Sequence, residues 1–301
     1  MGFLPFFFDC TCSAYNWLTR DTRAYWSIYT HRVTILVVQR SVTMGRLTLI
    51  LIILSLIGST LVMVGGDQFV KSEFPAVSIL KTEYPSLKYR GPKESFEVKL
   101  YSFPPKGWVP LSRISVKAIQ AIVISEDSAF YQHRGYDPQQ INEALRKDFQ
   151  ERRFARGAST ITQQVVRNVF LEKEKKIWRK VKELYLAVQL EKSVSKRRIL
   201  EVYLNIAEWG EGIYGISAAS RYYFGKQPEF LTAKEGAFLA MLLPSPKRYS
   251  QSYRRRDLTR YAENSIQSIL NKMAMTHKLT PEEFEQEKLE PLSFRVDELA
   301  P

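Results

Sequence analysis

The chain has 301 residues, of which 45% are hydrophobic, and it carries a formal net charge of +13. The length would allow two domains, but an apolar segment in the first third leaves residues for about one catalytic core and excludes a second. The first 66 residues contain five Arg and two Asp, so 39 basic and 29 acidic residues remain and the rest of the chain is basic in its own right. Such a charge suits an anionic partner, either nucleic acid or an anionic lipid surface.

The first 43 residues differ in composition from everything that follows. They are rich in aromatic residues and Arg, and they contain neither Lys nor Glu. Met44 stands directly before Arg46 and an apolar run, so we expect the translated chain to begin at Met44. Cys10 and Cys12 are the two cysteines of the chain and both lie in this stretch, so the cysteine count says nothing about the cellular compartment.

Residues 47–66 are predicted to form one transmembrane anchor. Leu47 to Val64 is almost wholly apolar and uncharged, with Arg46 before it and Gly65-Gly66 after it. About 20 such residues cross the hydrocarbon layer of a membrane. A cleaved signal peptide is the alternative, but its apolar core would be shorter and no clear small-x-small cleavage site follows. An anchor on a basic chain favours a lipid surface as the anionic partner, and we expect no nucleic acid.

Residues 67–103 are predicted to be a membrane-proximal linker. Pro75, Pro85 and Pro92 interrupt short β-prone stretches such as residues 96–100. After this segment helical periodicity dominates and long alternating strands are absent, so the fold class is expected to be mostly α.

The first helix after the linker is expected to deliver a carboxylate at its carboxyl end. Ile114, Ala118, Ala121 and Ile122 recur at helical spacing, and Glu126 follows them. A carboxylate in that place experiences the unfavourable end of the helix dipole, which raises its pKa and suits a general base.

Later segments predict three more helices. The first is expected over residues 232–243, which begin with the capping-box sequence Thr-Ala-Lys-Glu and end before Pro244. A further helix places Glu201 and Asn205 four residues apart, so both can face one cavity. Another helix places Arg179 and Glu183 one turn apart on a polar face beside an apolar stripe. That stripe consists of Trp178, Val181, Leu184, Tyr185 and Val188.

Four sequence blocks carry residues suited to glycosyl transfer, which needs a base for the attacking hydroxyl and cations for an anionic leaving group. They read Glu-Asp-Ser-Ala-Phe-Tyr-Gln-His-Arg-Gly at 126–135, Gly-Ala-Ser-Thr-Ile-Thr-Gln-Gln at 157–164, Arg-Lys-Val-Lys-Glu at 179–183, and Lys-Arg-Arg-Ile-Leu-Glu-Val-Tyr-Leu-Asn at 196–205. Their order and spelling resemble the family 51 peptidoglycan glycosyltransferases, over roughly residues 100–250. Tyr-Leu-Asn-Ile-Ala-Glu-Trp-Gly at 203–210 resembles the monofunctional biosynthetic members in particular.

The resemblance implies a lysozyme-like glycosyltransferase domain with a smaller membrane-associated lobe. The catalytic domain would occupy residues 104–255, and residues 256–301 would form a helical tail. Residues 1–46 would be cytoplasmic, with the anchor passing once through the inner membrane and the catalytic domain on the periplasmic side. The implied reaction polymerises lipid II into glycan strands with inversion and releases polyprenyl diphosphate.

Three other readings compete with this function. A lytic transglycosylase or muramidase shares the fold and a catalytic Glu, but it needs no pyrophosphate site. A bifunctional synthase would carry a transpeptidase domain, yet too few residues follow residue 250 to build one. A membrane-tethered scaffold that has lost activity would not need both acids, Glu126 and Glu183.

The resemblance also assigns roles to single residues. Glu126 is the expected general base, and Glu183 is the second acid, which either positions the pyrophosphate cations or holds a divalent ion. Asp127 would orient the base or satisfy local backbone donors, and His133 is expected to be structural. The remaining expected substrate-binding residues are Ser159, Thr160, Gln163, Gln164, Arg167, Arg179, Lys180, Lys182, Glu201 and Asn205.

Two details qualify these assignments. Arg167 stands where the family often has Lys, a change that keeps the charge but alters hydrogen-bond geometry. For Glu201 and Asn205, structural support of the cleft is as well founded as substrate contact.

Residues 149–156 mix aromatic rings with Arg and are expected to lie at the membrane surface.

No tightly bound cofactor is expected, and a divalent cation such as Mg²⁺ or Mn²⁺ is the one candidate. The expected partners are lipid II, the growing glycan chain, the membrane, and other proteins of cell-wall synthesis or division.

Overall fold

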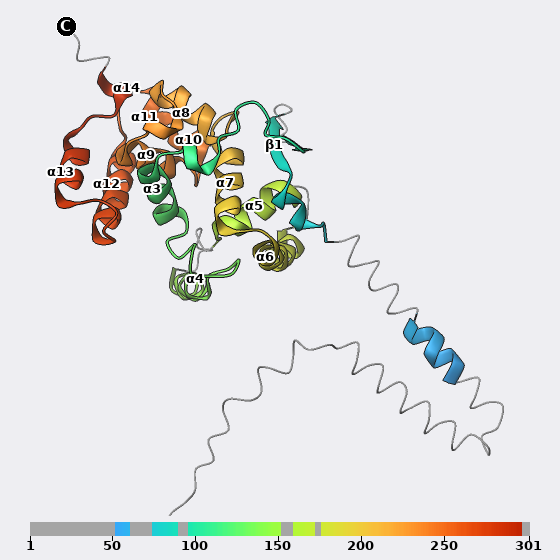
Figure 1. Cartoon of the computed structure of the whole chain (residues 1–301). Helices are drawn as coiled ribbons and strands as arrows, with labels where there is room; N and C mark the ends of the chain where they lie inside the picture. The colour runs from blue at the N-terminus through green and yellow to red at the C-terminus, as the bar shows by residue number, and fades with distance from the viewer. Residues whose placement is uncertain (1–51, 61–73, 90–95, 152–158, 172–175, 297–301) are drawn as a thin grey trace, which may run out of the picture. The chain divides into compact units, whose positions relative to one another are not determined.

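The computed structural model describes residues 52–60, 74–89, 96–151, 159–171 and 176–296 (Figure 1). The chain divides into two units, residues 1–72 and residues 73–301. In the first unit only residues 52–60 are described, and they form a helix inside the predicted anchor. The rest of that predicted anchor and the predicted start at Met44 lie outside the described residues. Among the helices that the structure describes, none has the length and apolar character required to cross a membrane.

The second unit begins with a short helical turn and a hairpin. The 3₁₀ helix η2, Val77–Lys81, precedes β1, Tyr84–Tyr89, which pairs antiparallel with β2, Phe96–Tyr101. Val77, Leu80 and Leu87 are buried in the core. Arg198 donates to the carbonyl oxygens of Leu80 and Glu83, at 3.1 and 2.9 Å. The predicted linker over residues 67–103 thus contains regular structure in its described parts, residues 74–89 and 96–103, and its buried residues Val77, Leu80 and Leu87 pack on the catalytic unit.

The rest of the described unit is mostly helical, as predicted, and the two further strands form one short hairpin. Its elements in chain order are η3 Leu111–Arg113, α3 Val116–Glu126, α4 Pro138–Glu151, α5 Ile161–Phe170, α6 Lys176–Ser193, α7 Lys196–Ile206, β3 Glu208–Gly210, β4 Ile213–Tyr214, α8 Ile216–Phe224, η4 Pro228–Phe230, α9 Ala233–Leu242, α10 Pro246–Tyr249, α11 Gln251–Arg254, α12 Arg260–Met275, α13 Pro281–Leu289 and α14 Ser293–Val296.

The centre of the unit is formed by α3 against α9, two helices with short apolar faces. Ser115 caps α3 by accepting a hydrogen bond from the Ala118 amide, and Thr232 caps α9 in the predicted capping box. A Cβ at Gly236 would lie 2.5 Å from the Cα of Ala118, so α9 needs glycine there to approach α3 this closely. Every residue of α9 except Lys234 is buried, which fixes the position of α3 and of its last residue, Glu126.

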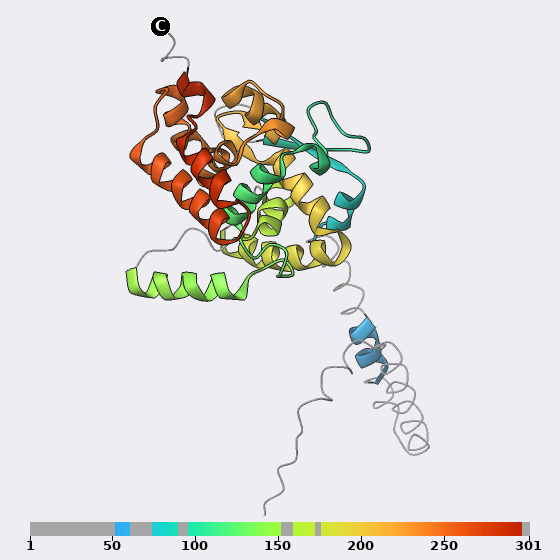
Figure 2. The same ribbon diagram turned by 60° about the vertical axis from the view of Figure 1, so that its left-hand side comes forward.

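The C-terminal region belongs to this core rather than to a separate tail. α12 packs on α9 and α3, and Ile266, Ile269, Leu270 and Met273 of α12 are buried. In the described part of the predicted helical tail over residues 256–301, which ends at residue 296, α12, α13 and α14 are helical, and the apolar stripe of α12 packs into the folded unit. Figure 2 shows α4 along the edge of the unit, apart from these tightly packed helices.

The sequence predicted an apolar stripe on α6 beside a polar face, and the structure shows which way that stripe points. The expected apolar stripe points outward, with Trp178 47%, Val181 52% and Tyr185 43% exposed, whereas Leu186 and Leu190 are buried against α5. The stripe was taken from spacing alone, which cannot distinguish the core face of a helix from an apolar face that stays outside. The second unit therefore presents an apolar surface on α6.

Candidate active site

Glu126 ends α3 and has its carboxylate held by two neighbouring helices. Its Oε2 accepts a hydrogen bond from Gln164 Nε2 of α5 at 2.8 Å and a longer one from the Tyr203 hydroxyl of α7 at 3.5 Å. The Tyr203 hydroxyl also lies 3.4 Å from Gln164 Oε1. Three helices that are distant in sequence thus meet at one carboxylate, and each fixes it from a different side.

Burial raises the pKa of Glu126 above its ordinary value. The hydrogen bonds from Gln164 and Tyr203 and the positive charge of Arg167 oppose that rise, while the nearby Asp127 adds to it. The sequence predicted a raised pKa from the helix dipole, and the direction agrees, but removal from water is the largest cause. A raised pKa makes the ionised carboxylate a stronger base at neutral pH.

Asp127 connects two other parts of the site, His133 and the start of α5, through hydrogen bonds. It is 1% exposed, its two carboxylate oxygens each lie 3.0 Å from His133 Nε2, and Oδ2 accepts from the Ile161 amide at 2.9 Å. The Gly135 amide donates to His133 Nδ1, so the ring proton lies on Nε2 and is donated to Asp127. Asp127 therefore satisfies a backbone donor and holds His133, which is one of the two roles expected of it, while a contact of Asp127 with substrate stays a prediction.

The first turn of α5 is closed by a capping box. Thr160 accepts from the Gln163 amide, and the Gln163 side chain accepts from the Thr160 amide. The Thr160 hydroxyl donates to the Gly135 carbonyl at 2.8 Å. Gly135 has φ +100°, and a Cβ there would lie 2.8 Å from the backbone of Ala187, so only glycine fits. Thr160 and Gln163 are buried and engaged in this cap, which supports the helix that carries Gln164 and Arg167. Their expected contact with substrate stays a prediction.

A second acid lies on α6 with two cations beside it. Glu183 is 1% exposed, and its Oε1 accepts from Lys180 Nζ at 2.6 Å. Arg179 NH1 lies 3.9 Å from Glu183 Oε2, as the i, i+4 spacing predicted. Lys180 also donates to the Ser159 hydroxyl at 3.0 Å, which connects α6 to the residue before the capping box. Arg179 and Lys180 are thus held in place by Glu183 while their outer parts remain exposed.

Lys182 lies on the same helix and is 3% exposed. Its amine lies 5.8 and 5.9 Å from the ring centroids of Phe74 and Trp178. The expected contact of Lys182 with pyrophosphate stays a prediction.

Glu201 and Asn205 hold an earlier segment of the chain instead of a substrate. Glu201 accepts from the Trp108 indole at 3.1 Å and from the Leu111 amide at 3.0 Å. Asn205 exchanges two hydrogen bonds with the backbone of Val109, both at 2.8 Å. Of the two roles left open by the sequence, these bonds show structural support, and contact with substrate stays a prediction.

Two contributors were missed from the sequence. Tyr203 was noted only as part of the blocks at 196–205 and 203–210, although a buried Tyr normally finds a partner for its hydroxyl, and here the partner is Glu126. Glu191 accepts from Thr162 Oγ1 and from Lys196 Nζ, at 2.5 and 2.7 Å, and thereby fastens α5 to the start of α7. No motif marked Glu191, because its partners come from two other helices.

Some expected features lie outside the described residues. These include most of the interfacial segment, from residue 152 to 156, and the Gly157-Ala158 turn. Among the residues that the structure does describe, no three His, Cys, Asp or Glu side chains are grouped so that they could hold a metal ion.

Comparison with known proteins agrees with this arrangement. The transglycosylase family model matches residues 99–274. A biosynthetic peptidoglycan transglycosylase of Nitrosomonas eutropha is 44% identical over 142 residues, which are 47% of this chain and 58% of that protein. Proteins with the same name from Nitrosospira multiformis and Thiobacillus denitrificans are 38% and 44% identical, over 56% and 50% of this chain.

The matches cover only part of each protein. They span 58% of the Nitrosomonas eutropha relative, 71% of the Nitrosospira multiformis relative and 66% of the Thiobacillus denitrificans relative. The family match nevertheless contains every element that holds Glu126, from α3 to α7. The chain belongs to the transglycosylase family.

Proposed function

We propose that this chain is a peptidoglycan glycosyltransferase that polymerises lipid II into glycan strands. Glu126 takes the proton of the 4-hydroxyl of the acceptor sugar, whose oxygen then attacks the anomeric carbon of the donor. The bond from that carbon to the diphosphate oxygen breaks, so polyprenyl diphosphate leaves and the configuration inverts. The observation that carries the proposal is the half-buried Glu126 carboxylate, with a raised pKa, held by Gln164 and Tyr203.

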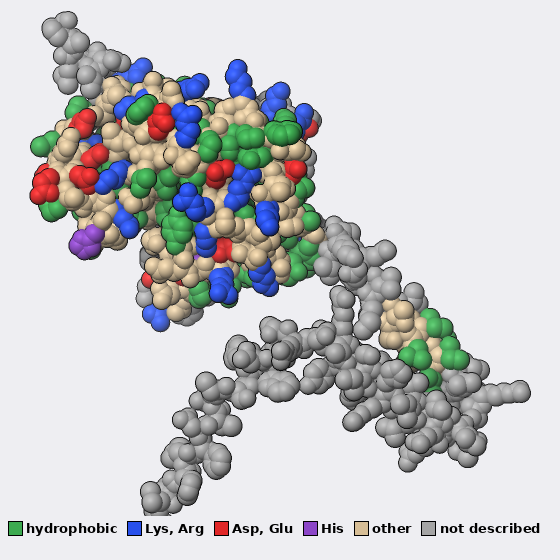
Figure 3. Space-filling view, in the orientation of Figure 1, with side chains coloured by type: hydrophobic (Ala, Val, Ile, Leu, Met, Phe, Trp, Pro, Cys, Tyr) green, Lys and Arg blue, Asp and Glu red, His purple; other side chains and the backbone are tan. Residues whose placement is uncertain are grey.

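The diphosphate leaving group needs cations to stabilise its negative charge, and the described residues include three. Arg167 lies near enough to Glu126 to affect its pKa, and Arg179 and Lys180 lie beside Glu183. Preorganised cations stabilise charge that develops on a leaving diphosphate more than charge already present in the ground state. Lys and Arg side chains are also spread over the middle and lower part of the face in Figure 3, whereas Asp and Glu gather over α13 at its left end.

The residues at Glu183 do not fit a divalent ion that the protein alone would hold. A protein site for Mg²⁺ or Mn²⁺ needs several oxygen ligands. In the described part of the chain, Glu183 contributes one carboxylate, and its nearest charged partners are the cations Lys180 and Arg179. We therefore assign Glu183 to orienting these cations and derive no step through a metal.

The same cations argue against the lytic alternative. A muramidase cleaves a bond between sugars and releases no diphosphate, so its reaction would give no role to the cations Arg167, Arg179 and Lys180. The biosynthetic names of the relatives point in the same direction.

A membrane location follows from the substrate and from α6. Lipid II is a membrane lipid, and the exposed Trp178, Val181 and Tyr185 of α6 give the catalytic unit an apolar face suited to an interface. We propose that this face belongs to the smaller, membrane-associated lobe of a lysozyme-like domain. Residues 47–66 would be the single anchor, and the catalytic unit would work on the periplasmic side of the inner membrane.

The test is to give the full chain, in detergent or vesicles, either fluorescent lipid II or preformed glycan strands. The proposal expects lipid II to be converted into long products that a muramidase degrades, while the preformed strands stay intact. Shortening of preformed strands without growth from lipid II would instead establish the lytic activity.

A further inference from the structure

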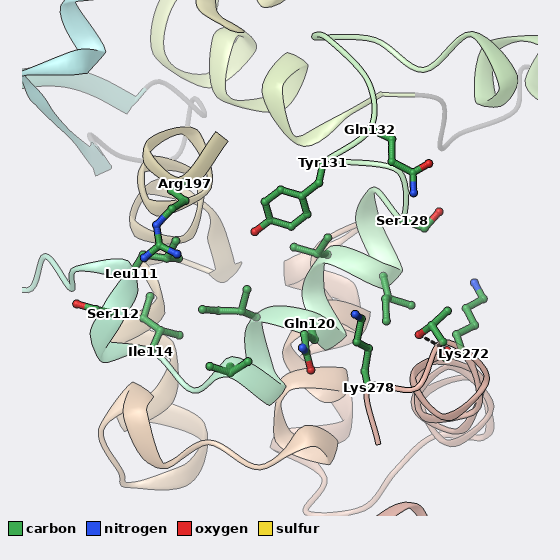
Figure 4. A pocket seen from close by; sticks show the side chains of 15 residues that line it. Leu111, Ser112, Ile114, Gln120, Ser128, Tyr131, Gln132, Arg197, Lys272 and Lys278 are labelled. Atoms are coloured by element: carbon green, nitrogen blue, oxygen red, sulfur yellow. Dashed lines mark hydrogen bonds between the residues drawn. The ribbon is translucent and has the colours of Figure 1, made fainter. Parts of the chain in front are cut away.

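A pocket of about 660 Å³ lies along the outer face of α3, on residues that the reaction above does not use (Figure 4). Its floor is apolar and comes from α3, with Ile119, Val123 and Ile124, and from Leu111 and Ile114 beside it. The volume falls in the range of about 300–1,000 Å³ that is typical of small-ligand sites. The pocket is therefore large enough to hold a small ligand.

The rim of this pocket is basic. Arg197 of α7, Lys272 of α12 and Lys278 of the following loop line it, and none of the described residues that line it is acidic. Nor does any of these three side chains form an ion pair within the described part of the chain. Figure 4 shows Arg197 and Tyr131 on one side of the apolar floor, Lys278 on the other, and Lys272 at the edge. Uncompensated cations around an apolar floor suit a ligand that is partly apolar and carries anionic groups.

One polar atom in the wall has no hydrogen-bond partner among the residues that the structure describes. Gln120 is half-buried and lines the pocket from α3, and its Oε1 is buried without a hydrogen bond. Buried polar atoms are nearly always bonded, so a ligand donor would satisfy Oε1 once the Gln120 side chain turned into the pocket. This observation is independent of the charges on the rim.

The pocket begins next to the catalytic carboxylate in the chain. Ser128 and Tyr131 line it, two and five residues after Glu126. Burial raises the pKa of the Tyr131 hydroxyl, and Arg197 opposes that rise, which shows that the guanidinium acts on this ring at the mouth of the pocket. The pocket and Glu126 thus share α3 and the turn after it, although Glu126 itself does not line the pocket.

We propose that the pocket binds the peptide that the disaccharide units of the substrate carry. The proposal rests on the proposed function, because only a peptidoglycan precursor brings sugar and peptide together. A peptide joined to a sugar through one end leaves a free carboxylate at the other, which matches Arg197, Lys272 and Lys278. Its backbone amides supply the donor for Gln120 Oε1, and its small side chains cover Ile119 and Val123.

The first experiment measures binding, so its result does not depend on turnover. The full chain in detergent is titrated calorimetrically with a soluble muramyl pentapeptide and, separately, with N-acetylmuramic acid that carries no peptide. The peptide form should bind and the bare sugar should bind at least tenfold more weakly. Arg197→Ala and Lys278→Ala should each weaken the peptide form about tenfold, as loss of a charge-assisted hydrogen bond does.

Arg221→Ala is the matched control, because Arg221 is an exposed arginine of α8 that does not line the pocket. It should leave the peptide affinity unchanged. Equal affinities for the two probes, or equal losses in Arg221→Ala and Arg197→Ala, would overturn the proposal. Displacement of the peptide by vesicles of anionic phospholipid, with no loss in Arg197→Ala, would also overturn it and identify a lipid surface as the occupant.

Gln120→Leu separates ligand binding from a purely structural role. Leu has a similar size and removes the unpartnered oxygen, so the free protein should become no less stable in urea unfolding while the affinity for the muramyl pentapeptide falls. Unchanged affinity in Gln120→Leu would contradict the assigned donor contact.

A second assay compares polymerisation of lipid II with that of the same lipid without peptide. Parent chain that is inactive on both would contradict the proposed function, whereas equal rates on both would contradict only the peptide pocket.

Discussion

Replacing Asp127 by Ala should destabilise the catalytic unit and disturb the active site together. Asp127 is buried and accepts from the Ile161 amide at 2.9 Å and from His133 Nε2 at 3.0 Å. Ala removes both acceptors and leaves two buried donors without partners. Each unpaired buried donor costs about 1–3 kcal/mol, so the free energy of unfolding should fall by about 2–6 kcal/mol. Ile161 is the first residue of α5, so the helix that presents Gln164 to Glu126 should also become less well held.

The measurement is urea unfolding of the full chain in detergent, followed by tryptophan fluorescence, together with the rate of lipid II polymerisation. Glu285→Ala serves as the control, because Glu285 forms an exposed pair with Lys288 and such pairs contribute about 0–1 kcal/mol. Asp127→Asn keeps one acceptor and should lie between Ala and the parent in both stability and rate. Parent-like stability in Asp127→Ala with a lost rate would refute the positioning role and indicate direct contact with substrate.

Three further predictions follow from the site and its surroundings. Tyr203→Phe removes a hydrogen bond that favours the ionised form of Glu126, so the acid limb of the kcat/KM profile should move to higher pH; an unmoved limb would contradict this contact. Gly236→Ala should cost about 1–3 kcal/mol in urea unfolding, because its Cβ would meet the backbone of α3 at 2.5 Å; unchanged stability would show that α3 and α9 can separate freely. In vesicles with brominated acyl chains, emission from the full chain should be quenched, and Trp178→Phe should remove much of that quenching; equal quenching in both would exclude the α6 face from the membrane.

Features set by local sequence were predictable. The capping box at Thr232 and the helix that ends at Glu126 follow from spacing and short-range hydrogen bonds, and the structure contains both. The same holds for Arg179 and Glu183, which share one helix and lie four residues apart. In each case the interacting groups are close in sequence, so a helical period is enough to bring them together.

Features that depend on packing between distant elements were not predictable. The apolar stripe of α6 could face either the core or the outside, and its spacing is the same in both cases. Residues 74–103 contained prolines and short strands typical of a linker, but Arg198 binds two of its carbonyls. Glu201 was a candidate for substrate binding, but in the structure it accepts hydrogen bonds from Trp108 and Leu111, which lie about 90 residues earlier in the chain. Such long-range partners leave no periodic pattern in the sequence.

The role of Glu126 as general base is tested most directly by Glu126→Gln. The replacement keeps the shape of the side chain and an oxygen that can accept from Gln164, but it cannot take a proton. Single-turnover polymerisation of lipid II and the equilibrium affinity for lipid II are measured on the full chain in the same detergent. The rate should fall about 10²- to 10⁴-fold, the usual contribution of a general base, while the affinity stays within about twofold of the parent. A rate within tenfold of the parent, at unchanged affinity, would contradict the assignment of Glu126 as the base.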